Sequence, residues 1–299
     1  MTDSATVAQT SAAPERPYIR PVTIFTIPID RDTLFSNHKG VYKKQVENRQ
    51  RRLIVKSTLI KSFMNYGECI RCITTAYSPV PTIEKDLTGP AFLYFKRALL
   101  IFTDKRILHL PTRFNRSPRG AVSQILYEDC AGIDIKGGAL EVRYKNGKQE
   151  IFNHIGRKER KKLRVLISMV CLQSEEKGQG NHLQGRTYLC PRCTHVLPKD
   201  ASRCEACNLV FKNMLKAGLW TFLIPGGGFF YFRYPLAGTL VALFEIFLIA
   251  FILFDWVEIT NVVSPDHGLT ALPAAGLLMG KMISLFYVKQ MVQEHVAEN

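Results

Sequence analysis

The sequence predicts a multidomain α+β membrane protein: a β-rich domain closed by a helix, a four-cysteine module and an α-helical transmembrane hairpin. Three observations lead to this fold class. Short β-type segments separated by turn residues fill the middle of the chain. Two Cys-x-x-Cys pairs follow them, and the last third contains two apolar stretches of twenty residues. A chain of 299 residues has room for two or three domains.

Changes in composition divide the chain into six segments. The first is rich in Ser, Thr and Ala and lacks the apolar core of a signal peptide, so we expect a disordered tail. A polar, Gly-rich stretch before the cysteines is typical of a linker. The predicted segments are a disordered tail (1–20), a basic strand and helix extension (21–66), a β-rich domain (67–173), a linker (174–186), a metal module (187–212) and a membrane domain (213–299).

Positive charge is concentrated before the first apolar stretch. The formal net charge is +15, and segments 39–61, 157–164 and 186–216 carry +7, +5 and +4. The extension contains a predicted strand at 21–30 and a predicted basic helix at 41–64. This helix either packs on the next domain with a solvated outer face or contacts an anionic surface. The candidate lipid- or partner-binding residues are Lys43, Lys44, Arg51, Arg52, Arg157, Lys158, Lys161 and Lys162.

Six or seven short strands precede an amphipathic helix in the β-rich domain. Asn146-Gly147 is the strongest hairpin signal among the turns between them. The helix has apolar residues on one face and the basic run 157–164 on the other. The predicted strands lie at 69–77, 92–102 (one or two strands), 106–110, 124–127, 133–135, 140–144 and 149–153.

Part of this domain resembles a known family. The strand–turn–strand at 99–107 (LLIFTDKRI), together with 127–129 (YED), is similar to the bacterial pleckstrin-homology-like (PH-like), GRAM-related family. The resemblance covers about a hundred residues. It implies a PH-like β-barrel with a C-terminal helix, and it implies no particular ligand.

The two Cys-x-x-Cys pairs predict a metal site. Each pair places two thiolates on one tight turn, and four thiolates form a closed structural Zn²⁺ site. A cytoplasmic location keeps thiols reduced, which favours metal ligation over disulfides. The segment CPRCTHVLPKDASRCEACNLVF also resembles the small bacterial zinc-ribbon family, which implies a structural zinc ion. The predicted ligands are Cys190, Cys193, Cys204 and Cys207.

Three apolar stretches follow the cysteines. Those at 235–254 and 269–288 have the length of about 20 residues that a spanning helix needs. The stretch at 215–232 is interrupted by Pro225-Gly226-Gly227-Gly228, so we expect a re-entrant or interfacial hairpin there. The text LIPGGGFFYFRYPLAG resembles small two-span membrane domains.

The charges around the apolar stretches favour two full spans. The loop 255–268 contains no Lys or Arg, whereas Arg233 and Lys289 flank the opposite ends of the two stretches. Two spans put both cations on the cytoplasmic side, as the positive-inside bias requires. Three full spans, the alternative, would put them outside.

Two charged residues lie inside the predicted spans. Glu245 and Lys281 are about 15 Å and about 11 Å from the cytoplasmic ends, at 1.5 Å per helical residue. Unpaired charges at such depths are costly, so we expect an intramembrane pair. The pair serves packing within or between subunits, or an ion or proton pathway, or a contact with lipid.

We expect a non-enzymatic membrane-anchored adaptor or regulator. Its PH-like domain and zinc ribbon would bind an anionic lipid surface or a protein partner at the cytoplasmic face. Catalysis is least supported, because the chain contains no phosphate loop, Gly-x-Ser-x-Gly or His-Glu-x-x-His motif. One alternative is a homo-oligomeric transport or channel component that uses Glu245 and Lys281. The other is a membrane-tethered nucleic-acid binder, which the position of the ribbon beside the bilayer disfavours.

The predicted location is the bacterial inner membrane. No secretory signal is seen and the basic segments precede the apolar stretches. We therefore expect residues 1–212 and the C-terminus in the cytoplasm.

Overall fold

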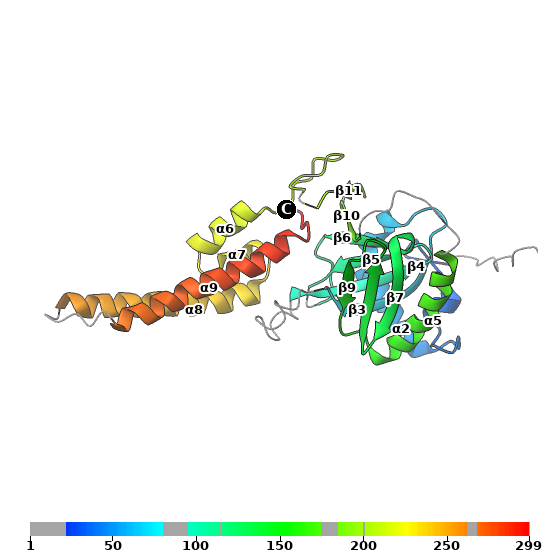
Figure 1. Ribbon diagram of the computed structural model, residues 1–299, viewed down its shortest axis with the longest axis horizontal. Helices are drawn as coiled ribbons and strands as arrows, with labels where there is room; N and C mark the ends of the chain where they lie inside the picture. Colours follow the sequence, from blue (N-terminus) through cyan, green and yellow to red (C-terminus); the bar gives the residue numbers. More distant parts are fainter. Residues whose placement is uncertain are drawn as a thin grey trace, which may run out of the picture.

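A computed structural model describes residues 22–79, 95–113, 115–174, 185–199, 201–261 and 268–298. It has a mixed α+β part built on two sheets, from which a rod of helices projects (Figure 1). This confirms the α+β class and the apolar helical hairpin at the C-terminal end. The predicted tail (1–20) and most of the predicted linker (174–186) lie outside the described residues.

Strands β1 to β6, β10 and β11 form one sheet, and β7 to β9 form a second sheet. The larger sheet contains β1 (Val22–Ile24), β2 (Ile27–Ile29), β3 (Ile70–Tyr77), β4 (Arg97–Thr103), β5 (Arg106–Pro111), β6 (Val122–Leu126), β10 (Thr187–Leu189) and β11 (Val196–Leu197). The smaller sheet contains β7 (Cys130–Lys136), β8 (Ala139–Tyr144) and β9 (Gln149–Phe152). Strands β3 to β9 occupy the places that the sequence predicts, within a few residues.

Strands β4 and β5 lie between two hydrophobic cores. Their side chains alternate between the two faces of the sheet, as the period of two requires. On one face Leu100 and Phe102 join the smaller sheet and helix α5 (Arg157–Ser174). On the other face Leu99 and Ile101 join the N-terminal elements. Both strands are therefore almost completely buried.

The N-terminal extension covers the second face of the larger sheet. It contains β1, β2, α1 (Arg31–Phe35), α2 (Lys44–Lys56) and a 3-10 helix, η1 (Thr58–Phe63). The predicted single helix at 41–64 is wrong in its second half. The Ser57 hydroxyl donates to the carbonyls of Leu53 and Ile54 and ends α2, and η1 then follows. Ile60 and Phe63 of η1 are still buried against the sheet.

In the described residues the two sheets do not close into a barrel. Strands β3 and β9 meet through a single bridge, between Tyr77 and Asn153. At the other corner, β10 pairs with the edge of β6, which leaves that edge unavailable to β7. The larger sheet contains strands from both sides of the segment boundaries predicted at 66/67 and 186/187. The domain boundaries themselves stay predictions.

A buried ion pair holds the turn between β4 and β5. Arg106 donates to both carboxylate oxygens of Glu68, at 3.0 and 2.8 Å. The Thr103 hydroxyl donates to Glu68 at 2.7 Å. Arg106 also donates to the Gln124 side chain and the Phe63 carbonyl, so its donors are used within the fold. The Thr103 and Arg106 side chains of the TDKR turn therefore have a structural role.

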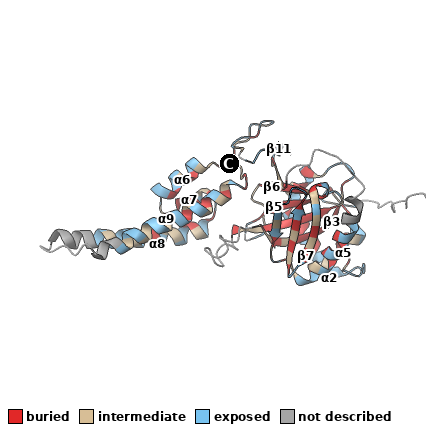
Figure 2. Ribbon diagram, viewed as in Figure 1, coloured by how far each residue is buried: buried red, intermediate tan, exposed pale blue. Residues whose placement is uncertain are grey.

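The helical rod consists of four helices. These are α6 (Met214–Leu223), α7 (Gly227–Tyr231), α8 (Pro235–Asn261) and α9 (Gly268–Val292). The windows Pro235–Phe254 and Leu272–Val292 have mean hydropathies of 2.5 and 1.2, and only 11% and 17% of them are buried. Figure 2 shows exposed residues along the described parts of α6, α8 and α9. Helices α8 and α9 are therefore long and apolar enough to cross a membrane.

Replacing Glu68 by Gln tests the buried network. The Arg106 side chain is only 7% exposed, so the loss of its counter-charge should destabilise the fold by about 3–5 kcal/mol. Denaturant unfolding of the full chain in detergent micelles measures this. Glu141→Gln is the control, because Glu141 pairs with the exposed Lys136 and should cost less than about 1 kcal/mol. Equal effects of the two substitutions would contradict the role of the network.

Candidate metal centre and membrane junction

The two cysteine turns have the same backbone design. In the first, the Cys190 N–H donates to the His195 carbonyl at 2.8 Å, and the Thr194 N–H donates to the Cys190 carbonyl at 2.9 Å. The same two bonds, both 2.9 Å long, recur around Cys204 in the second turn. The residues that follow the turns, Thr194 and Asn208, have φ angles of 62° and 55°. The repeated geometry aims both cysteine pairs at one point.

The structure brings the four predicted ligands together. Their sulfurs lie within 4.8 Å of one another. The sulfurs of Cys190 and Cys207, and those of Cys193 and Cys204, are each separated by 3.5 Å. Zn–S bonds of about 2.3 Å would separate sulfurs in a tetrahedron by about 3.8 Å. The donor set therefore fits a metal ion held by four thiolates, and such an ion has no open position for a substrate.

The protein influences the ionisation of these thiols. Burial raises the pKa of Cys190 to about 12. Burial also raises the pKa of Cys204, but hydrogen bonds with the backbone N–H groups of Cys207 and Ala206 and with the Cys193 and Cys190 thiols together lower that pKa to about 7. A bound dication would favour the thiolate at all four positions.

The metal module is attached to the rest of the chain on two sides. Strand β10 joins it to β6 of the larger sheet. On the other side, Phe211 forms a β-bridge with Ala297, and the Lys212 N–H donates to the Val296 carbonyl at 2.9 Å. The C-terminal residues thus return to the module after α9. The sequence analysis missed this contact, because a segment of so few residues has no period to reveal it.

An ion pair joins the end of α9 to the sheets. Glu294 lies 2.7 Å from Arg119 and 3.9 Å from Lys96. The Arg119 guanidinium also lies over the ring of Tyr234, 4.9 Å from its centroid, just before α8 begins. These side chains are mostly buried, so the contact fixes the helical rod against the α+β part of the chain, which is called the soluble part below.

The break between α6 and α7 is packed tightly into the rod. A Cβ atom at Gly226 would lie 2.1 Å from the backbone oxygen of Gly238 in α8. A Cβ atom at Gly228 would lie 2.3 Å from the Thr221 hydroxyl and 2.7 Å from Val288. Only glycine fits at these two positions without movement of the neighbouring helices.

Glu245 and Lys281 meet at this break. Lys281 Nζ lies 2.8 Å from Glu245 Oε2 and donates to the Thr221 carbonyl at 2.6 Å. The same carboxylate oxygen accepts the Gly226 N–H at 3.0 Å. In a continuous helix residue 225 would donate to the Thr221 carbonyl, but Pro225 has no N–H. Lys281 takes the place of that donor.

The other carboxylate oxygen, Glu245 Oε1, is buried and has no hydrogen-bond partner among the described residues.

The two ends of the interrupted hairpin lie side by side. Lys212, which precedes α6, donates to the carbonyl of Tyr231 at the end of α7. Its ammonium group also lies 5.1 Å from the ring centroid of Phe232. Burial lowers the pKa of Lys212 to about 8, and the charges of Arg233 and Arg113 add to the shift. The chain therefore enters and leaves this hairpin at the same place.

The predicted lipid- or partner-binding residues lie elsewhere. They lie on or beside α2 and at the start of α5, at the end of the soluble part farthest from α8 and α9 (Figure 1). Seven of the eight are exposed, and five of the eight line a groove of about 600 Å³. Lys162 is buried and donates to the carbonyls of Leu34 and Ser36 at 2.8 and 3.0 Å. Lys44 and Arg51 form ion pairs with Glu47.

Comparison with known proteins identifies no family. No family model and no curated protein matches the chain. One solved structure, the C-terminal domain of an unknown protein from Leishmania infantum, is similar over 42% of this chain and 98% of that chain, at 13% identity and a TM-score of 0.26. A likeness at that score carries no inference about fold or function.

Replacing Cys190 and Cys193 together by Ser removes two of the four thiolates. We expect the full chain, purified in detergent, to lose about one bound metal ion, as measured by elemental mass spectrometry. Proteolysis between residues 186 and 213 should become faster, because metal binding stabilises such a small module. Cys69→Ser is the control and should keep its metal, since Cys69 lies outside the cluster. Unchanged metal content in the double variant would contradict the site.

Replacing Lys281 by Met tests the intramembrane pair. It leaves Glu245 without its counter-charge and Thr221 without a donor, which should cost about 3–5 kcal/mol. Lys281→Met combined with Glu245→Leu should cost less than the sum of the single changes. Thermal unfolding in detergent measures both, with the exposed Lys289→Met as control. Additive effects would show that the two charges do not support each other.

Proposed function

We propose that this chain is a non-enzymatic membrane-anchored adaptor. Its C-terminal helices hold it in a membrane, and its soluble part presents a basic surface to a partner protein. The observation that supports this most is the placement of two surfaces. The exposed Lys and Arg residues of α2 and α5 lie at one end of the molecule, and the apolar helices lie at the other (Figure 1).

The membrane topology that we propose has two spans, α8 and α9, and a re-entrant hairpin formed by α6 and α7. Two contacts support it. Lys212 lies beside Tyr231, so the hairpin returns to the side from which it enters. Phe211 pairs with Ala297, so the C-terminal segment lies on the same side as the metal module. Three full spans would separate both pairs by the thickness of the bilayer.

The cytoplasm is the side that we assign to the soluble part. Arg233 and Lys289 lie at the ends of α8 and α9 that face it, and the connecting loop at the far ends contains no Lys or Arg. A bacterial inner membrane is the location that we propose, since the PH-like and zinc-ribbon families that the chain resembles are both bacterial. A reducing cytoplasm also suits four unpaired thiols, and zinc is the ion that we propose for them.

We further propose that the soluble part is a PH-like domain with an opened corner. Strands β3 to β6 and β7 to β9 form groups of four and three, and helix α5 follows them. Leu163, Leu166 and Ile167 of α5 pack into the core between the groups. The zinc ribbon occupies the opened corner, where β10 pairs with β6.

A protein partner fits the basic surface better than the lipid of the same membrane. Lys43, Arg157, Lys158 and Lys161 line a groove beside α2 and α5. These two helices lie at the end of the soluble part farthest from the helices that anchor the chain (Figure 1). A surface with this excess of cations attracts acidic partners and accelerates their association.

Transport through the membrane helices is the second candidate function. It is motivated by Glu245 Oε1, which has no hydrogen-bond partner in the part of the chain that the structure describes. However, the remaining contacts of Glu245 and Lys281 join them to each other and to the hairpin backbone. This arrangement favours a structural role for the pair.

The adaptor proposal is tested with Lys158→Gln combined with Lys161→Gln in the full chain. We expect affinity purification from native membranes, with isotope-labelled quantification, to show an acidic protein depleted about tenfold in this variant. The control, Lys145→Gln with Lys148→Gln, makes the same charge change at exposed residues of the turn between β8 and β9. It should still co-purify with that protein.

Identical sets of co-purified proteins for the wild type and the α5 variant would contradict the adaptor proposal. If nuclease treatment of the wild-type sample removes the co-purified protein, the result would instead favour the nucleic-acid binder as the function.

A further inference from the structure

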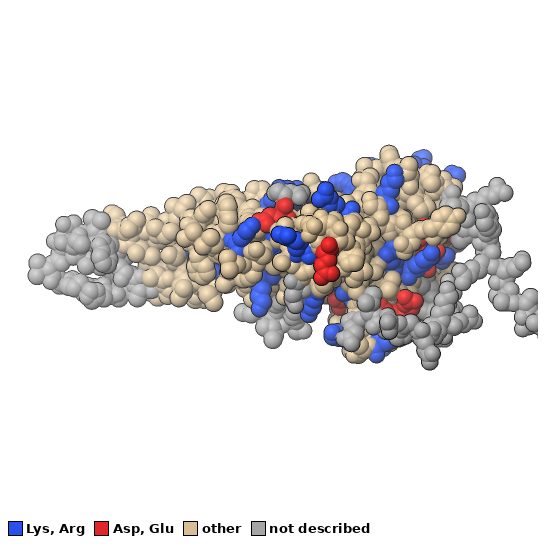
Figure 3. Space-filling model, turned by 90° about the horizontal axis from the view of Figure 1, so that it is seen from above, with Lys and Arg blue, Asp and Glu red and all other residues tan. Residues whose placement is uncertain are grey.

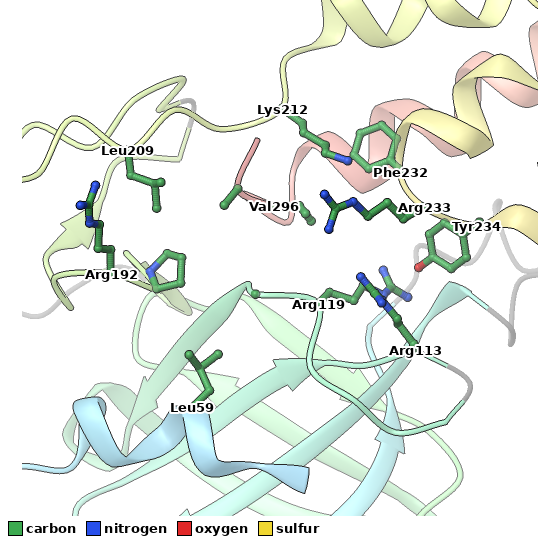
Figure 4. Close-up of a pocket in the computed structure, with 13 residues that line it drawn as sticks. Leu59, Arg113, Arg119, Arg192, Leu209, Lys212, Phe232, Arg233, Tyr234 and Val296 are labelled. Atoms are coloured by element: carbon green, nitrogen blue, oxygen red, sulfur yellow. The ribbon is translucent and has the colours of Figure 1, made fainter. Parts of the chain in front are cut away.

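A second basic site lies at the opposite end of the soluble part. A cavity of about 450 Å³ opens where the larger sheet, the metal module and the helical rod meet (Figure 4). Arg113 and Arg119, which follow β5, line one wall, and Arg192 of the metal module lines another. Arg233 and Tyr234, between α7 and α8, line the wall beside the membrane helices. Contacts far apart in the sequence therefore create the cavity.

The lining is strongly cationic. Four arginines and Lys212 line the cavity, and no Asp or Glu is among its described lining residues. Figure 3 shows blue Lys and Arg side chains, with a few red Asp and Glu side chains among them, where the rod joins the soluble part. Arg119 and Lys212 are engaged in structural contacts, with Glu294 and the Tyr231 carbonyl. The Arg113 and Arg192 side chains are exposed and form no ion pair with the described residues.

Figure 4 shows the side chains of Arg113, Arg119 and Arg233 extending toward a common region. Arg233 is held there by a backbone in the left-handed region, with φ of 61°, which is unfavourable for a residue that has a Cβ. The crowding of like charges also contributes to the lowered pKa of Lys212, after burial. Arg119 is already paired with Glu294, so an anion between these side chains would add a counter-charge chiefly for Arg113.

The cavity lies at the level of the membrane surface. Phe232 and Tyr234 line it, and α8 begins at the next residue, Pro235. The apolar window of α8 also begins at Pro235. Aromatic side chains at the end of a span are typical of the headgroup region. The anions that such a position meets most often are lipid phosphates.

We propose that this cavity binds a phosphate group, and that the headgroup of an anionic phospholipid supplies it. Guanidinium groups bind phosphate through two parallel N–H donors, and several of them converge here. The volume is within the range of sites for small molecules. This site is separate from the α2 and α5 surface and goes beyond the adaptor function. Bound lipid would join the soluble part, the metal module and the rod.

The test measures binding to the full chain in micelles of an uncharged detergent. Isothermal titration uses three probes: dihexanoyl phosphatidylglycerol, dihexanoyl phosphatidylcholine and inorganic phosphate. Arg113→Gln with Arg233→Gln should weaken binding of the anionic lipid about tenfold, which is 1.4 kcal/mol. Arg113→Lys with Arg233→Lys keeps the charge but loses the two parallel N–H donors, so its affinity should lie between those of the wild type and the Gln variant. The matched control, Lys145→Gln with Lys148→Gln, should bind as the wild type does.

Each outcome separates the sources or decides the proposal. Stronger binding of phosphatidylglycerol than of the other two probes supports a lipid, whereas equal binding of inorganic phosphate supports the site with a soluble anion as its source. Equal affinities of wild type and both arginine variants, or no binding of any probe, would overturn the proposal. If the double Gln variant does not fold, Arg113→Gln alone replaces it, because that side chain is exposed.

The adaptor proposal is decided independently. Partner loss in the α5 variant, without phosphate binding by the wild type, removes only the cavity proposal. Phosphate binding that depends on Arg113, without partner loss, removes only the adaptor proposal.

Discussion

The helical rod depends on one constraint: backbone N–H and carbonyl groups that a break in a helix leaves unpaired in an apolar environment must find other hydrogen-bond partners. The chain breaks a helix at Pro225 and Gly226, which leaves the Thr221 carbonyl and the Gly226 N–H without helical partners. Lys281 and Glu245 satisfy these two groups and each other. Two charges that would each be costly alone thus stabilise the break in the helix, and they connect α8 and α9 to the hairpin.

Because the hairpin turns back, its ends lie together at one end of the helical rod, and several segments converge there. Lys212 contacts the end of α7, and the residues after α9 pair with the metal module. Glu294 then joins α9 to the soluble part through Arg119. The four-cysteine module therefore lies between β6 on one side and the C-terminal segment on the other. A metal ion held by the four cysteines would stabilise the connection between the sheets and the helices as well as its own module.

This arrangement separates two basic surfaces by the length of the soluble part. The surface of α2 and α5 is remote from the membrane helices, whereas the cavity of Arg113 and Arg233 adjoins them (Figures 1 and 4). Similar charge can therefore serve different ligands, because the position of each surface determines which anions reach it. The sequence analysis considered the first surface for both lipid and protein, and it did not find the second.

Local patterns were enough to predict the strands β3 to β9, the four thiol ligands and the two long apolar helices. Each depends on periodicity, spacing or composition within a short window, and Glu245 and Lys281 could be paired because depth in a span follows from residue count. The edge of β6 that β10 occupies, the hydrogen bond from Lys281 to Thr221 and the cavity could not be predicted. They depend on contacts between distant segments, such as Arg119 and Glu294, which are 175 residues apart. No local period encodes such contacts, because they form only when the packing of whole elements brings the side chains together.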